Sequence, residues 1–121
     1  MKKLLILLFT LIALNAYAVN KSTTFTNDLF KQAQLDGKTV VINSWEETCT
    51  TCKKQIKFLD QAEKEFSDIL FLSFEQTKDK DIAKQLSIDY WTTIVVYKDN
   101  KEVHRSIGQM DKAKIYELIK S

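Results

Sequence analysis

The 121-residue sequence contains no proline and has two glycines, Gly37 and Gly108. Because these glycines lie far apart, the chain cannot form a glycine-rich phosphate loop of the GxGxxG or Walker type. The absence of proline also excludes a proline-rich linker and a collagen-like repeat. The sequence therefore excludes the nucleotide-binding enzymes that depend on such loops.

Histidine and excess charge are also scarce. His104 is the single histidine of the sequence, which gives little support to a Ser-His-Asp or carboxylate-pair hydrolase. The chain has 18 basic and 16 acidic residues, and without its first 18 residues, which include Lys2 and Lys3, both numbers are 16. Since phosphate binding needs a clustered cationic excess, we expect no nucleic-acid partner.

The first 18 residues have the pattern of an export signal. An almost unbroken apolar run covers residues 4–14, and Ala16-Tyr17-Ala18 has the small-x-small form of a cleavage site. We expect cleavage after Ala18 and one folded domain at residues 19–121, located in the periplasm or outside the cell, where disulfides persist. The alternative is a retained membrane anchor, although Thr10 and Asn15 interrupt a run that should span about 20 apolar residues.

Residues 25–121 alternate between helical and strand patterns. Thr26 or Asn27 and later Asp111 can cap helices, and Asp36-Gly37 can end one. In the long helical segment, the expected buried face consists of Cys52, Ile56, Leu59, Ala62 and Phe66. We expect helices ending at Asp36, at 49–67, at 79–86 and after Asp111, and strands at 39–44, 69–74, 93–97 and 102–107.

The order of these segments predicts the α/β fold class. Strands 39–44 and 69–74 should be parallel, because a crossover helix joins them. Strands 93–97 and 102–107 should form an antiparallel hairpin through a turn at Asp99-Asn100. The continuous apolar character of the first strands indicates two buried faces, so we expect a central mixed β-sheet flanked by helices on both faces.

The strongest functional signal is Cys49-Thr50-Thr51-Cys52, at the junction between a central strand and a long helix. Two intervening residues place both sulfurs in the first helical turn, close enough to bridge. The free N–H groups and the dipole at the helix start would stabilise a thiolate on Cys49. The lysines that follow Cys52 would add to this effect, whereas Glu46 and Glu47 would oppose it if they faced the sulfur.

Three roles are open to this cysteine pair. In redox exchange, the Cys49 thiolate attacks a partner disulfide and Cys52 resolves the mixed disulfide. A purely structural disulfide would restrain little of the unfolded chain, because its loop is so short. A metal site would need three or four ligands, of which His104 is the one imidazole available. We favour redox exchange without metal or cofactor, and a metal-binding or partner-docking module is the alternative.

The chain resembles the thioredoxin superfamily over residues 25–120. The residues that carry the resemblance are Val40-Val41-Ile42-Asn43-Ser44-Trp45, Cys49-x-x-Cys52-Lys53, Trp91-Thr92-Thr93-Ile94-Val95-Val96-Tyr97 with its hairpin, and Gly108. The resemblance implies a thiol:disulfide oxidoreductase with a redox disulfide, in which Cys49 is the nucleophile and Cys52 resolves. It also implies that Trp45, Trp91 and Thr92 lie where substrate binds.

The same resemblance implies partners and a direction of exchange. The expected partners are protein disulfides or dithiols and a membrane electron donor, met by a monomeric protein. Exported relatives of this fold include both reductants and oxidants of disulfides. Because this compact sequence shows no extra substrate-binding insertion, we favour the reducing role.

Three departures from the family pattern lie near the cysteines. Thr50-Thr51 replaces Gly-Pro between them, so the family's redox potential cannot be transferred to this chain. Thr48 replaces a second tryptophan. Asn43 replaces a buried carboxylate that assists proton transfer, so proton removal from Cys52 falls to water or to another group such as Glu47.

A fourth departure is Thr92, which stands at the position of the family's cis-proline. A cis peptide bond before a residue other than proline costs about 3–4 kcal/mol. We therefore expect the Trp91–Thr92 bond to be trans. The Thr92 hydroxyl could then bond to a sulfur, or a more open site could admit a metal.

Overall fold

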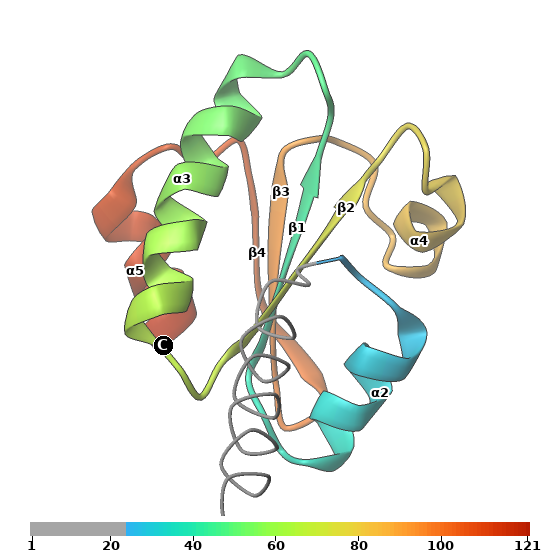
Figure 1. Ribbon diagram of the computed structural model, residues 1–121, viewed down its shortest axis with the longest axis vertical. Coiled ribbons are helices and arrows are strands. Elements are labelled where there is room, and N and C mark those ends of the chain that lie inside the picture. Colours follow the sequence, from blue (N-terminus) through green and yellow to red (C-terminus); the bar gives the residue numbers. More distant parts are fainter. Residues whose placement is uncertain (1–23) are drawn as a thin grey trace, which may run out of the picture.

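The computed structural model describes residues 24–121 (Figure 1). The predicted signal at residues 1–18 lies outside the described residues, as does the predicted start of the domain at residue 19. The described elements are, in chain order, α2 (Asn27–Leu35), β1 (Val40–Trp45), α3 (Thr50–Glu65), β2 (Leu70–Glu75), α4 (Lys80–Gln85), β3 (Thr93–Lys98), β4 (Lys101–Ile107) and α5 (Lys112–Lys120). Every predicted helix and strand is present, with bounds that differ by one or two residues.

The predicted caps and turns account for these bounds. The Thr26 hydroxyl accepts a hydrogen bond from the Leu29 N–H at 3.1 Å and so begins α2. Gly37 follows α2 with φ +70°, a conformation that glycine adopts without strain. Asp99 and Asn100 both have positive φ, at 51° and 65°, and form the two-residue turn between β3 and β4.

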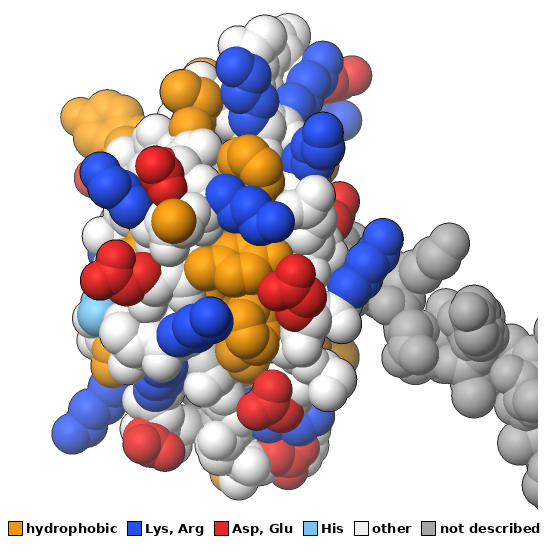
Figure 2. All heavy atoms as spheres, turned by 90° about the vertical axis from the view of Figure 1, so that its left-hand side faces the viewer, with side chains coloured by type: hydrophobic (Ala, Val, Ile, Leu, Met, Phe, Trp, Pro, Cys, Tyr) orange, Lys and Arg blue, Asp and Glu red, His pale blue; other side chains and the backbone are white. Residues whose placement is uncertain are grey.

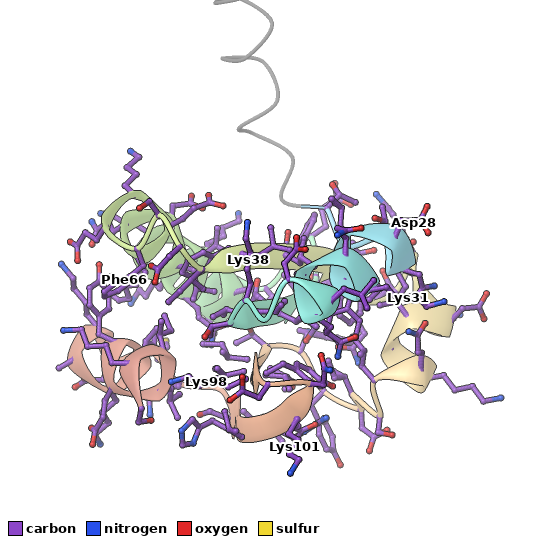
Figure 3. All side chains as sticks on the ribbon, turned by 90° about the horizontal axis from the view of Figure 1, so that it is seen from below. Asp28, Lys31, Lys38, Phe66, Lys98 and Lys101 are labelled. Atoms are coloured by element: carbon purple, nitrogen blue, oxygen red, sulfur yellow. A yellow bond between two sulfur atoms is a disulfide. The ribbon has the colours of Figure 1, made fainter. Side chains whose placement is uncertain are left out.

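The four strands form one mixed sheet in the order β2-β1-β3-β4. β1 is parallel to β2 and antiparallel to β3, and β3 and β4 pair as an antiparallel hairpin. Helices α3 and α5 lie on one face of the sheet, and α2 and α4 lie on the other (Figures 1 and 3). The predicted fold class is confirmed.

Two hydrophobic clusters, one on each face of the sheet, hold these layers together. Val40 and Ile42 of β1 point into the cluster shared with α2 and α4. Val41, between them, points into the cluster shared with α3 and α5. Successive side chains of a strand point to opposite faces, so a strand segment that lies between two hydrophobic clusters is apolar at consecutive positions.

The outer seam between α3 and α5 is apolar and edged with charge. Figure 2 shows apolar side chains gathered down the middle of this face, with lysines and acidic residues beside them. The rings of Phe66 and Tyr116 meet edge-on with centroids 5.7 Å apart. The Lys112 ammonium lies 5.4 Å from the Tyr116 ring centroid, and the Lys120 ammonium lies 5.7 Å from that of Phe66. The contacts of Phe66 join the end of α3 to α5, and the contact between Lys112 and Tyr116 lies within α5.

Asn43 and Ser44, the polar residues of β1, belong to its last part, which lies at the end of the sheet where α3 begins (Figure 1). Seen from below, Lys38, Lys98 and Lys101 lie at the opposite end (Figure 3).

Among residues 24–121, no helix combines the length and apolar character needed to cross a membrane.

Arg105 of β4 ties this strand to the end of α4. Its guanidinium donates to the carbonyls of Leu86 and Ser87 at 2.8 and 2.9 Å, and it pairs with Glu102 at 2.7 Å. We expect Arg105→Ala to lower the free energy of unfolding by about 1–2 kcal/mol, because two carbonyls lose a charged donor. Urea denaturation measures this change.

The control variant is Glu102→Gln, which removes the exposed ion pair and leaves the carbonyl bonds intact. Its effect should be below about 0.5 kcal/mol, since exposed ion pairs contribute little. An equal loss in both variants would show that the ion pair, and not the bonds to α4, stabilises this corner.

Candidate active site

Cys49 begins helix α3 and accepts a hydrogen bond there. Its backbone is extended (φ −81°, ψ 108°), and its Sγ accepts the Cys52 N–H at 3.0 Å. The sulfur therefore takes the place that a serine or aspartate oxygen usually occupies at a helix start. A negative charge on this sulfur would face an N–H donor and the positive end of the helix dipole.

Cys49 and Cys52 form a disulfide, with their Cα atoms 5.2 Å apart. This separation lies within the ordinary range for disulfides. Cys52 is 1% exposed and packs inward, whereas Cys49 is only partly buried. An incoming group can therefore reach the outer sulfur, Cys49, and not the inner one.

Of the two carboxylates near Cys49, those of Glu46 and Glu47, one is hydrogen-bonded within the turn that precedes Cys49. The Glu46 carboxylate accepts hydrogen bonds from the Thr48 hydroxyl at 2.6 Å and from the Thr48 N–H at 3.0 Å. Glu47 is exposed, as are Lys53 and Lys54 after the pair. Basic side chains gather at the upper end of the α3 face, where the helix begins (Figure 2).

The Trp91–Thr92 peptide bond is cis, so the prediction of a trans bond is wrong. The prediction weighed the local cost of a cis bond and had no measure of the contacts around Thr92. That residue is 2% exposed, and its hydroxyl oxygen lies 3.0 Å from the Ser44 carbonyl oxygen. Its own carbonyl accepts the Gly108 N–H at 2.8 Å. Contacts from β1 and from the residue that follows β4 thus define the conformation of this loop.

A buried polar network connects this loop to β1 and α3. Asn43 Nδ2 donates to Gln55 Oε1 at 2.6 Å and to the Thr92 hydroxyl at 3.1 Å. The Thr92 hydroxyl also bonds to Gln55 Oε1. An ionised aspartate in place of Asn43 would put a second acceptor against Gln55 Oε1, so an amide donor fits this position.

Ser44, the neighbour of Asn43, holds the other side of the loop. Its hydroxyl donates to the Tyr90 carbonyl at 3.2 Å and accepts the Thr93 N–H at 3.1 Å. The Thr93 hydroxyl donates to the same Tyr90 carbonyl at 2.5 Å. Neutral amide and hydroxyl groups of Asn43 and Ser44 therefore hold this loop, without an ionised side chain.

The three predicted substrate-binding residues lie in different environments. Thr92 is buried and belongs to the network. Trp91 and its neighbour Tyr90 are 47% and 63% exposed. Trp45 is partly buried at the end of β1. Only Trp91 offers a large free apolar surface to a partner.

Trp45 also lines a cavity of about 310 Å³ between α3 and the sheet, together with Asn43, Asp60 and Glu63. Burial raises the pKa of Glu63, and the nearby Asp60 carboxylate raises it further. Cys49 and Cys52 do not line this cavity. The cavity is therefore a feature of the α3 face and not of the disulfide.

Residues 24–121 contain no group of three or more His, Cys, Asp or Glu side chains that could hold a metal ion. His104 lies on β4, where its Nε2 is 2.6 Å from the Ser121 hydroxyl. The described residues thus give the metal alternative no third ligand beside the two cysteines.

Gln55 was not among the predicted site residues, and it is fully buried at 0% exposure. The expected apolar face of α3 included its neighbour Ile56, which is only partly buried. The missed signal was spacing, because a residue three positions after Cys52 shares its helix face. A polar residue on that face must find a buried partner.

Glu75, at the end of β2, closes a turn beside the site. The Thr77 hydroxyl donates to its carboxylate at 2.8 and 2.7 Å, and the Lys78 N–H donates at 2.9 Å. The bond from the Thr77 hydroxyl is the main cause that lowers the pKa of Glu75, against a smaller effect of burial. The ionised form thus stabilises the folded state.

We therefore expect Glu75→Gln to lower Tm at pH 7. The native advantage is present above the ordinary carboxyl pKa of about 4.3 and is lost as the pH falls through the lower folded-state pKa. Thermal unfolding at pH 7 and pH 3 should show the difference between the two proteins shrinking in acid. Glu117→Gln, on the exposed side of α5, is the control, and an equal response there would argue against this assignment.

Comparisons with known protein families agree with this geometry. The family model described as Thioredoxin matches residues 18–121. The thioredoxin of Mycoplasma pneumoniae is 36% identical over 80 residues, which make up 66% of this chain and 78% of that protein. The thioredoxin of Chlamydia trachomatis is 31% identical over 80 residues, with the same two coverages.

Solved structures show the same fold. Trxlp from Edwardsiella tarda superposes with a TM-score of 0.75 at 22% identity, over 79% of this chain and 95% of that one. Thioredoxin from Fasciola hepatica superposes with a TM-score of 0.69 at 26% identity, over 77% of this chain and 89% of that one. The fold is therefore that of a known family.

Proposed function

This chain belongs to the thioredoxin family, and we propose that it reduces disulfides of partner proteins outside the cytoplasm, with Cys49 as nucleophile and Cys52 as resolving thiol. Family membership and the bonded cysteine pair make it a thiol-disulfide oxidoreductase. The observation that carries the proposed roles is the asymmetry of the pair. Cys49 is partly exposed at a helix start, and Cys52 is buried one turn inside.

The first step forms a mixed disulfide. The Cys49 thiolate attacks one sulfur of the partner disulfide, and the other partner sulfur leaves as a thiolate. The hydrogen bond from the Cys52 N–H and the dipole of α3 support the thiolate before the attack. The partner sulfur that leaves then takes a proton from water.

The second step releases the partner. The Cys52 thiol loses its proton and attacks the Cys49 sulfur, and the second partner sulfur leaves as a thiolate. Two electrons have then passed from Cys49 and Cys52 to the partner, and the Cys49–Cys52 disulfide remains. Asn43 cannot accept the Cys52 proton, so water, or a carboxylate such as the exposed Glu47, takes it.

The partner docks beside Trp91. Trp91 and Tyr90 present exposed aromatic surface next to the cis peptide bond. Ile107 of β4, which is also exposed, lies near this surface because it pairs with Thr93 of β3. Aromatic side chains of this kind contribute strongly to protein interfaces. We assign Trp91 and Thr92 to partner binding, with Trp45 as a neighbour of the site.

The reducing direction rests on the compact form of the described domain. Residues 24–121 form eight elements joined by short loops, without an added substrate-binding unit. To act repeatedly as a reductant, the protein must receive two electrons and two protons at the Cys49–Cys52 disulfide. We propose that a membrane electron donor with its own dithiol supplies them, and that the protein works as a monomer.

The reduction potential tests this direction. The protein is equilibrated with mixtures of reduced and oxidised glutathione and then alkylated. Mass spectrometry measures the fraction of protein molecules in which Cys49 and Cys52 are joined as a disulfide. For a reductant we expect a potential below about −200 mV. A value near −120 mV, which is about that of strong disulfide-forming oxidants, would overturn the reducing role.

Export is tested on the full chain in a bacterial host. Cell fractionation should place the protein outside the cytoplasmic membrane, and its intact mass should lack residues 1–18. A protein found in the cytoplasm with its first 18 residues intact would contradict the proposed location and leave the chemistry of the cysteines untouched.

A further inference from the structure

Gln55 is a polar side chain in an unusual place. It lies on α3 three residues after Cys52, so that the two share one helix face, and it is 0% exposed. Burying an amide is costly unless both its donor and its acceptor find partners. The side chain therefore has to be explained by the groups that it contacts.

These contacts connect three separate segments. Gln55 Oε1 accepts from Asn43 Nδ2 of β1 at 2.6 Å and from the Thr92 hydroxyl of the loop before β3. Gln55 Nε2 donates to the Gln109 carbonyl, between β4 and α5, at 2.9 Å. One side chain thus bonds the cysteine-bearing helix to the strand beneath it and to both loops beside it.

The chemistry of the network favours glutamine at this position. An ionised glutamate would have only acceptors and would face the Gln109 carbonyl. An asparagine is one methylene shorter, and methionine would fill the space without any of the three bonds. The Gln55 amide alone among these supplies an acceptor and a donor at the required reach.

We propose that Gln55 is a positioning residue, which holds the Thr92 loop in register with the first turn of α3 so that a docked protein meets Cys49 correctly. This inference rests on the proposed function and adds a specificity determinant to it. Since Gln55 is buried, it acts through Thr92 and Gln109 and not by touching the partner. Its importance should therefore depend on whether the substrate uses the loop.

The test compares two substrates in Gln55→Met. Insulin, a protein disulfide, needs the loop for docking, whereas 5,5′-dithiobis(2-nitrobenzoate), a small disulfide, needs little more than the exposed sulfur. We expect kcat/KM for insulin to fall at least tenfold, mainly through KM, and the rate with the small disulfide to change less than threefold. Gln61→Met, the same substitution later in α3, is the matched control and should change neither rate by more than twofold.

Thr92→Val removes the bond between Thr92 and Gln55 from its other end. This variant carries the test if Gln55→Met does not fold. It should reproduce the loss with insulin, and the double variant should lose little more than either single variant, because each single variant already breaks the bond between Gln55 and Thr92. Equal losses for both substrates, or no loss with insulin, would overturn the positioning role. A wild-type protein that reduced neither substrate would instead contradict the proposed function.

Discussion

Cys49→Ser should abolish the reduction of insulin, bringing the rate down to that of the dithiothreitol in the assay. A serine hydroxyl at the start of α3 could still accept the Cys52 N–H and cap the helix. It would not ionise near neutral pH and could not form a disulfide with the partner. The fold should therefore survive while the chemistry is lost.

The turbidity of precipitating insulin chains measures this loss, and circular dichroism checks the fold. Thr50→Ser, at the next position of the same turn, is the matched control and should keep the rate within about twofold, because Thr50 is exposed and takes no part in the exchange. Turnover by Cys49→Ser well above the dithiothreitol background would show that Cys49 is not the nucleophile.

Cys52→Ser should retain the first step and lose the second. Its Cys49 thiolate can attack the partner, but no thiol lies one turn inside to resolve the mixed disulfide. With pre-reduced protein and no dithiothreitol, we expect about one equivalent of partner to remain joined to Cys49 in this variant, whereas the wild-type protein releases its partner fully reduced. Non-reducing electrophoresis and intact mass spectrometry detect this adduct.

The reversibility of the adduct provides the control. Dithiothreitol should release the partner from Cys52→Ser, and Cys49→Ser should form no adduct under the same conditions. Release of reduced partner by Cys52→Ser in the absence of dithiothreitol would contradict the resolving role of Cys52.

Much of the fold could be predicted because local and tertiary preferences agree. The run Val40-Val41-Ile42 is apolar at every position, and a hydrophobic cluster covers it on each face of the sheet. Asp99-Asn100 tolerates positive φ and forms the hairpin turn. The approach of Cys49 and Cys52 follows from their spacing at a helix start, and the structure joins them in a disulfide.

The loop and network beside the cysteines could not be predicted from local patterns. The cis bond before Thr92 opposes a local preference, and the groups that surround it come from Ser44 and Gly108, 48 and 16 positions away. The burial of Gln55 could not be predicted because a helical pattern identifies the buried face from apolar residues alone. Gln55 is buried because it has hydrogen-bond partners in distant segments. Both departures from prediction lie at the site, where tertiary contacts outweigh local propensity.

The most direct test of the central claim is the pH dependence of alkylation in the reduced protein. The claim is that the Cys49 sulfur, at the start of α3, is a thiolate near neutral pH. Iodoacetamide should modify Cys49 first, with a rate that is half-maximal well below about pH 8.5, the value for a free cysteine. Modification of Cys52 first, or a half-maximal rate at or above that pH, would contradict the account.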